Sequence, residues 1–214
     1  MNKIILFDLD GTLIDSTEAI LESFRHSLKE HGALGEVPDS VITSQIGHTL
    51  ETMFAAVGIP MPLIDAHVAV YKLYYREISR QKTVLLPRAI EAIKEAAAFA
   101  RLGIVTTKTG LYSRELMEHF GVMEHFEVLI GREHVDNPKP HPEPIFKALE
   151  GMKATKESAW MIGDTRLDIE ASSRAGIGCV AVTSGYDNKE QLLTLTDIIK
   201  PDALEAVRYI AKRG

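Results

Sequence analysis

The chain has few of the features that would connect it with a membrane, with nucleic acid or with an oxidising compartment. Its one cysteine, Cys179, excludes an intrachain disulfide and offers no metal-binding spacing. No apolar run approaches the roughly 18 residues that a membrane helix needs, and the net charge of −6 lacks the basic excess typical of nucleic-acid binding. The first expected strand begins at residue 3 or 4, which leaves no room for a signal peptide. We therefore expect a cytoplasmic protein with no nucleic-acid or membrane partner.

What the sequence does contain is an alternation of short apolar runs with segments of helical period. The apolar runs, which we expect to be strands, are Ile4–Phe7, Leu102–Val105, Phe126–Ile130, Ala159–Ile162 and Cys179–Val182. Strands that alternate with helices form parallel sheets through right-handed crossovers, with helices on both faces. The sequence thus predicts an α/β fold with a Rossmann-like parallel sheet, in which ligands bind beyond the carboxyl ends of the strands.

One long segment, residues 15–83, contains no good strand and interrupts this alternation. Apolar residues at helical spacing recur in it instead, and the longest such series is Ile64, Val68, Tyr71, Tyr75 and Ile78. We expect an all-α helical-bundle cap over 15–83, inserted into a catalytic core formed by 1–14 and 84–214. A cap inserted just after the first strand would cover the carboxyl edge of the sheet as a lid; the alternative is a structural appendage.

The first apolar run ends in two acidic residues, Asp8 and Asp10, followed by Gly11. Two carboxylates at the end of a buried strand repel each other and lose hydration, so they cost stability unless a cation or a reaction uses them. We expect a catalytic pair of carboxylates here, rather than an acidic turn formed by chance.

Three later segments place matching groups after their predicted strands. A hydroxyl in the segment Thr106-Thr107-Lys108 can donate to a phosphoryl oxygen, with backbone N–H groups nearby. Lys139 lies among prolines, which stiffen its loop and fix the direction of its side chain. Asp164 and Asp168 are separated by one helical turn and can face one point. Together with Asp8 and Asp10 they offer hard oxygen ligands, which suit Mg²⁺.

An acidic cluster with a lysine and a divalent cation fits phosphoryl transfer, where positioning and charge neutralisation dominate. One aspartate can attack phosphorus and form an aspartyl-phosphate. A second acid can protonate the leaving oxygen and then deprotonate water. A non-enzymatic phospho-acceptor or binding module is a competing interpretation, but it gives Asp10 little purpose.

Four segments in order, Asp8–Leu13, Leu102–Lys108, Lys139–Pro144 and Gly163–Asp168, resemble the haloacid dehalogenase (HAD) superfamily of phosphohydrolases. The chain is most similar to the branch that holds phosphoglycolate phosphatases and bacterial pyrophosphatases. This resemblance implies a hydrolase, a Mg-dependent phosphatase whose partner is a small phosphorylated metabolite. Phosphoglycolate is the first expected substrate, with pyrophosphate or a sugar phosphate as alternatives. A β-phosphoglucomutase-like phosphotransferase is disfavoured, because no arginine follows Gly47.

The resemblance also implies roles for particular residues. Asp8 is the nucleophile and Asp10 the general acid/base, while Thr106 and Lys139 hold the phosphoryl group. The remaining residues expected at the phosphate-binding site are Gly11 and Thr107, although relatives often carry Asn in place of Thr107.

Mg²⁺ is implied to bind the Asp8 carboxylate, the Asp10 backbone carbonyl and Asp164, with Asp168 supporting directly or through water. The family often has glycine where Arg88 stands in this chain. Three side chains keep open roles: Lys108 contacts an anionic leaving group or pairs with a carboxylate, His48 meets the substrate or packs, and Arg166 faces solvent or the site. Both a monomer and a homodimer are compatible with the sequence.

Overall fold

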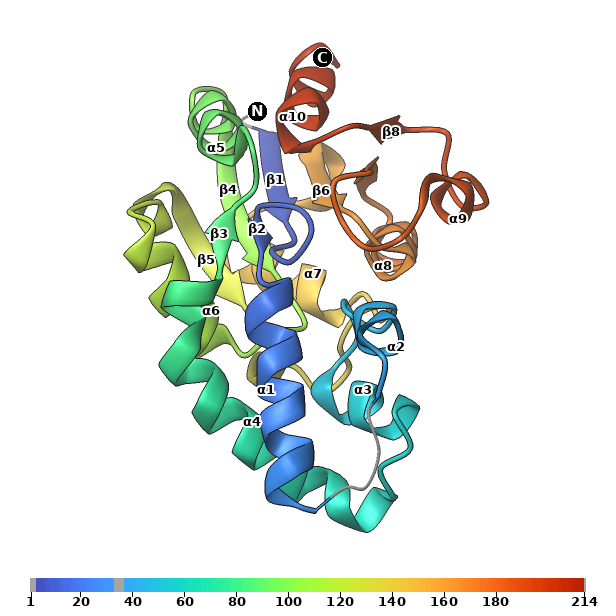
Figure 1. The fold of residues 1–214 in the computed structure, drawn as a ribbon. Coiled ribbons are helices and arrows are strands. Elements are labelled where there is room, and N and C mark those ends of the chain that lie inside the picture. Colours follow the sequence, from blue (N-terminus) through green and yellow to red (C-terminus); the bar gives the residue numbers. More distant parts are fainter. Residues whose placement is uncertain (1–2, 33–36, 214) are drawn as a thin grey trace. The chain divides into compact units, whose positions relative to one another are not determined.

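A computed structural model describes residues 3–32 and 37–213 of the protein (Figure 1). The chain divides into two compact units. We call Met1–Asp15 with Leu85–Gly214 the core unit, and Ser16–Val84 the helical unit. The chain passes between the units at two short strands, β2 (Ile14–Asp15) and β3 (Val84–Leu85), which form a two-stranded sheet.

The core unit is built on a six-stranded parallel sheet with the order β5-β4-β1-β6-β7-β8. The strands are β1 (Lys3–Phe7), β4 (Ala100–Val105), β5 (Phe126–Ile130), β6 (Ala159–Gly163), β7 (Gly178–Val182) and β8 (Ile199–Lys200). The central strand β1 pairs with β4 and β6, and Phe7 is level with both Ile104 and Ile162. The predicted α/β fold is confirmed, and the sequence missed only short strands such as β8.

Helices cover both faces of this sheet, as expected for parallel strands. The helices are α5 (Ala89–Ala97), α6 (Gly110–His119), α7 (Glu143–Gly151), α8 (Arg166–Ala175), α9 (Lys189–Leu193) and α10 (Ala203–Ala211). Ile5 and Phe7 pack in the cluster that includes α5, α6 and α10, whereas Ile4 and Leu6 pack in the cluster that includes α7 and α8. Successive β1 side chains therefore enter opposite hydrophobic layers, which explains the unbroken apolar run.

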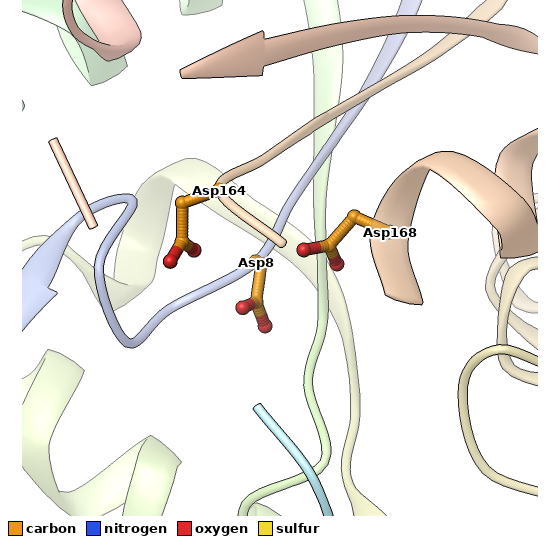
Figure 2. Close-up of side chains that lie close together, drawn as sticks. All are labelled: Asp8, Asp164 and Asp168. Atoms are coloured by element: carbon orange, nitrogen blue, oxygen red, sulfur yellow. The ribbon is translucent and has the colours of Figure 1, made fainter. Parts of the chain in front are cut away.

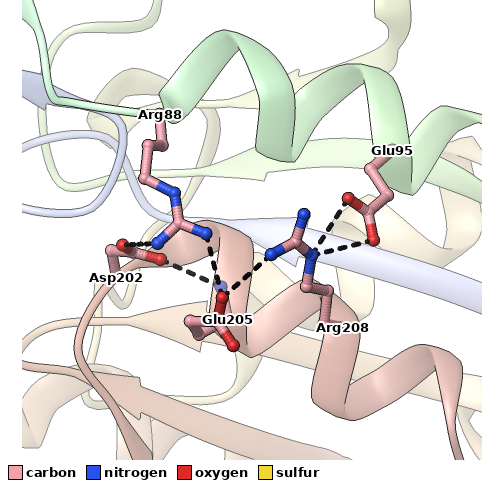
Figure 3. A network of polar contacts seen from close by, with 5 residues as sticks. All are labelled: Arg88, Glu95, Asp202, Glu205 and Arg208. Carbon is pink, nitrogen blue, oxygen red and sulfur yellow. Dashed lines mark hydrogen bonds and ion pairs between the residues drawn. The ribbon is translucent and has the colours of Figure 1, made fainter.

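An ion-pair network joins the start of α5 to α10 (Figure 3). Arg88 precedes α5 with a φ of +65°, a left-handed conformation that costs a non-glycine residue about 1 kcal/mol. Its guanidinium donates to Asp202 over 2.8 Å and to Glu205 over 2.9 Å. Arg208 of α10 in turn contacts Glu205 of the same helix and Glu95 of α5. These contacts help to retain an arginine where the backbone would favour glycine.

The helical unit consists of α1 (Thr17–Glu30), α2 (Asp39–Thr43), α3 (Leu50–Ala56) and α4 (Met61–Lys82) within its described residues. Its core contains a group of packed aromatic rings: Phe24 lies 4.3 Å from Phe54 in a tilted arrangement and 5.1 Å from Tyr71 in an edge-to-face arrangement, measured between ring centroids. The predicted all-α insert is confirmed. Over residues 3–32 and 37–213, none of the helices combines the length and the apolar character needed to cross a membrane.

Candidate active site

Three aspartates meet at the carboxyl edge of the central strands. Asp8 follows β1, Asp164 follows β6, and Asp168 lies in the first turn of α8. All three are buried, and each offers a carboxylate oxygen within 4.8 Å of those of the other two (Figure 2). The pairing of β1 with β6 brings Asp8 and Asp164 together, because Phe7, the last residue of β1, is level with Ile162 near the end of β6. The folded chain therefore brings together three of the four acids that the sequence pointed out, and the carboxylate of Asp10 is not part of this cluster.

Lys139 reaches this cluster from the loop between β5 and α7. Its Nζ atom lies 2.9 Å from Asp8 Oδ1 and 2.6 Å from Asp168 Oδ1, and it donates to the carbonyl of Val105 over 3.1 Å. Burial alone would lower the pKa of Lys139, but the negative charges of Asp168 and Asp8 outweigh burial and raise the pKa above its usual range. Lys139 is therefore a permanent cation inside the cluster.

The acids nevertheless outnumber this cation. The pKa of Asp8 is raised to about 7, because burial and the charge of Asp168, which both raise it, together outweigh the lowering effect of Lys139. Burial, followed by the charges of Asp8 and Asp168, raises the pKa of Asp164 well above its usual value. Asp8 Oδ1 receives no well-aligned hydrogen bond from the described residues, although it ion-pairs with Lys139. Excess buried carboxylate with unfilled acceptor capacity fits a site for a divalent metal ion.

Asp164 is held in place by groups that the sequence did not point out. Thr12 Oγ1 donates to its Oδ1 over 3.0 Å, and the Tyr186 N–H donates to its Oδ2 over 2.9 Å. A Cβ atom at Gly11 would lie 2.3 Å from Asp164 Oδ2, and one at Gly185 would lie 2.0 Å from it. Only residues without a side chain allow this close approach. The position of Gly185 just beyond the predicted strand Cys179–Val182 was the available signal.

Asp168 is likewise oriented by its own helix. Its Oδ2 accepts from the Thr165 N–H over 3.1 Å and from Thr165 Oγ1 over 2.8 Å, which forms a capping box at the start of α8. Its Oδ1 contacts Lys139. Arg166 donates its backbone N–H to Asp187 over 2.7 Å, and its side chain is half-buried. Asp168 therefore positions Lys139 as well as adding charge to the cluster.

The other predicted residues of the core unit occupy the ends of β1 and β4. Asp10 Oδ2 lies 3.0 Å from Lys108 Nζ. Thr106 is buried, its Oγ1 accepts from the Lys108 N–H over 3.2 Å, and the half-buried Thr107 follows it. Gly11 turns with a φ of +81° and donates its N–H to the carbonyl of Ile14. Its predicted contact with phosphate stays a prediction.

His48 belongs to the helical unit, where it lies half-buried in the loop before α3. It forms an isolated bridge with Ile46. Its open choice between substrate contact and packing stays a prediction.

Removal of one acid is expected to stabilise the metal-free protein. A raised pKa means that Asp164 favours folding below its unfolded-state pKa of about 4, and that this contribution is lost as pH rises through the folded-state value. Asparagine carries no charge that must be buried at high pH. Asp164→Asn should therefore raise the unfolding free energy at pH 8 by about 1–3 kcal/mol. Thermal unfolding without divalent ions should show a smaller gain at pH 5.

Asp187→Asn, the same substitution just outside the cluster, serves as the matched control and should show no such pH-dependent gain. An Asp164→Asn variant less stable than the wild type at pH 8 would contradict this electrostatic account. Added Mg²⁺ should raise the melting temperature of the wild type more than that of Asp164→Asn.

Together, the fold and this site define an α/β enzyme with a buried carboxylate–lysine centre. A family model described as haloacid dehalogenase-like hydrolase matches residues 5–182. A phosphoglycolate phosphatase of Aquifex aeolicus is 32% identical over 187 residues, with 86% of each chain covered. A pyrophosphatase of Listeria welshimeri is 36% identical over 181 residues, with 80% of this chain and 78% of that protein covered. The chain belongs to the haloacid dehalogenase-like hydrolases.

Solved structures agree with this assignment. A haloacid dehalogenase-like hydrolase from Bacteroides fragilis superposes with a TM-score of 0.90 at 27% identity, covering 96% of this chain and all of the other. The predicted resemblance is thereby confirmed, and so is the class of enzyme, a phosphatase within this hydrolase family.

Proposed function

We propose that the chain is a Mg²⁺-dependent phosphatase that hydrolyses a small phosphomonoester of the phosphoglycolate type through an aspartyl-phosphate. The observation that carries the proposal is the setting of Asp8: a buried carboxylate at the end of the central strand, beside the Lys139 ammonium and two further acids. The relative named phosphoglycolate phosphatase supports this choice of substrate.

In the first step Asp8 attacks phosphorus, and the bond from phosphorus to the leaving oxygen breaks as Asp10 gives that oxygen a proton. In the second step Asp10 takes a proton from water, which attacks phosphorus, frees Asp8 and releases phosphate. Lys139 and Thr106 hold the phosphoryl oxygens. Lys139 is suited to this task because its ammonium already lies 2.9 Å from the attacking carboxylate.

Asp8, Asp164 and the backbone carbonyl of Asp10 would hold Mg²⁺, with Asp168 supporting directly or through water. When bound, Mg²⁺ would offset the charge of the carboxylates and of the phosphoryl group. Asp164 is prepared for this role, because each of its oxygens accepts a hydrogen bond that fixes its direction and keeps a further lone pair.

The helical unit, Ser16–Val84, would act as the cap that selects the substrate. Inorganic pyrophosphate is the second candidate substrate, favoured by the 36% identity to a relative named pyrophosphatase. Both candidates are small and anionic, so a direct comparison of rates is required to separate them.

A panel of kcat/KM values tests the proposal, measured for phosphoglycolate, pyrophosphate, a hexose phosphate and a nucleoside monophosphate. We expect the highest value for phosphoglycolate, and a loss of at least about 100-fold after chelation of Mg²⁺. Equal rates with and without Mg²⁺ would refute the metal assignment. Failure to hydrolyse any of these phosphates would refute the phosphatase function.

A further inference from the structure

Lys108 is a second cation near the acids, and its backbone is held on two sides. Its N–H donates to Thr106 Oγ1 over 3.2 Å, and its carbonyl accepts from the Arg132 N–H over 3.0 Å. A Cβ atom at Gly131 would come within 2.9 Å of the Lys108 carbonyl oxygen, so the two loops are in close contact. The segment that carries Lys108 is therefore fixed at the carboxyl edge of β4.

The Lys108 side chain points at Asp10 rather than into solvent. Its Nζ atom lies 3.0 Å from Asp10 Oδ2, and the two side chains are only 9% and 11% exposed. Lys139 contacts different acids, Asp8 and Asp168. The two lysines are thus divided between the attacking carboxylate and the proposed general acid.

This division places Lys108 on the leaving-group side of the reaction. A general acid must approach the leaving oxygen to about 2.5–3.0 Å to transfer its proton. When Asp10 Oδ2 makes that transfer, the Lys108 ammonium lies at most about 6 Å from the leaving oxygen, the sum of the two contacts. A negative group a few bonds beyond the leaving oxygen falls within this distance.

We propose that Lys108 is a specificity-determining residue, which receives an anionic group that the leaving group carries a few bonds beyond the scissile oxygen. The inference rests on the proposed function. It names the substrate class as phosphate compounds with an anionic leaving group, namely 2-phosphocarboxylates of the phosphoglycolate type and pyrophosphate. A sugar or simple alkyl leaving group is neutral there and gains nothing from the ammonium.

A pair of substrates that differ only in this charge provides the test. Phosphoglycolate and 2-hydroxyethyl phosphate share the phosphoryl group and the leaving oxygen, but a carboxylate in the first is replaced by a neutral CH2OH group in the second. Lys108→Met should lower kcat/KM for phosphoglycolate about 10- to 100-fold more than for 2-hydroxyethyl phosphate, mainly through KM, because a charged hydrogen bond is lost with only one of them.

Lys108→Arg should retain part of the discrimination, because it keeps the positive charge. Lys108→Gln provides a second neutral variant in case the Met variant fails to fold. Lys189→Met removes the same charge from an exposed position on α9 and should leave the ratio of the two kcat/KM values unchanged.

Equal losses on both substrates would overturn the proposal, because they would reduce Lys108 to a residue that positions Asp10. A wild-type enzyme that hydrolyses both substrates equally well would also overturn it, while leaving the phosphatase function intact. A wild type that hydrolyses neither of these substrates nor pyrophosphate would refute the proposed function, and this proposal with it.

Discussion

Asp8→Asn is expected to lower turnover by at least about 10⁴-fold, the order of loss seen when a catalytic nucleophile is removed. The amide has nearly the shape of the carboxylate but cannot attack phosphorus, so the first step is lost while the fold is kept. The matched control is Asp197→Asn, an exposed aspartate far along the chain, which should keep full activity. Steady-state kinetics with the preferred phosphate of the panel measures the difference.

The same variant should be at least as stable as the wild type without divalent ions. Burial raises the pKa of Asp8 to about 7, so its favourable contribution to folding is present below about pH 4 and is lost as pH rises towards 7. Asparagine carries no charge to bury. Thermal unfolding of the variant and the wild type at pH 8 checks this prediction.

The nucleophile assignment has a direct test in the wild type. Mass spectrometry after an acid quench should find a phosphoryl group on the peptide that contains Asp8. Retained turnover in a folded Asp8→Asn variant would refute the nucleophile assignment.

Lys139→Met is expected to damage stability and activity together. Asp8 and Asp168 would lose the ammonium that lies 2.9 and 2.6 Å away, and would remain buried with uncompensated charge. Removal of one partner of a buried ion pair commonly costs about 3–5 kcal/mol. Turnover should fall by at least about 10³-fold, because the phosphoryl group would lose its fixed cation. Denaturant unfolding at pH 8 measures the loss of stability.

The pH dependence distinguishes this electrostatic cause from a simple loss of packing. At pH 5 Asp8, whose pKa is about 7, binds a proton, so the loss of Lys139 should cost less there than at pH 8. Lys147→Met is the matched control on α7, where the lysine side chain is 42% exposed and its ion pair should contribute no more than about 1 kcal/mol. A Lys139→Met variant as stable as the wild type at pH 8 would contradict the prediction.

Much of the fold could be predicted because its signals are local. The five apolar runs identify five of the six strands of the parallel sheet, with boundaries that differ by at most two residues. The missed strand, β8, has two residues and makes no periodic pattern. The helical insert was also readable, because the series from Ile64 to Tyr75 forms one buried face of α4.

Sequence analysis could not predict the parts of the candidate site that depend on backbone N–H groups and on glycines. Asp164 and Lys139 are recognisable by residue type. The Tyr186 N–H and the close approach of Gly185 are not, because any residue carries an amide and a glycine can serve many turns. These contacts arise only when the loop after β7 folds back on the end of β6.

Residue types and their order along the chain were sufficient to indicate an α/β hydrolase with acids at the strand ends, since strand and helix periods are properties of short segments. Which acids each lysine contacts could be established only from the folded chain. Phe7 is level with Ile104 and Ile162 in neighbouring strands, and this register carries the ends of β1, β4 and β6 to one place. Lys139 thus meets Asp8 and Asp168, and Lys108 meets Asp10, because strand pairing brings together side chains that are distant in sequence.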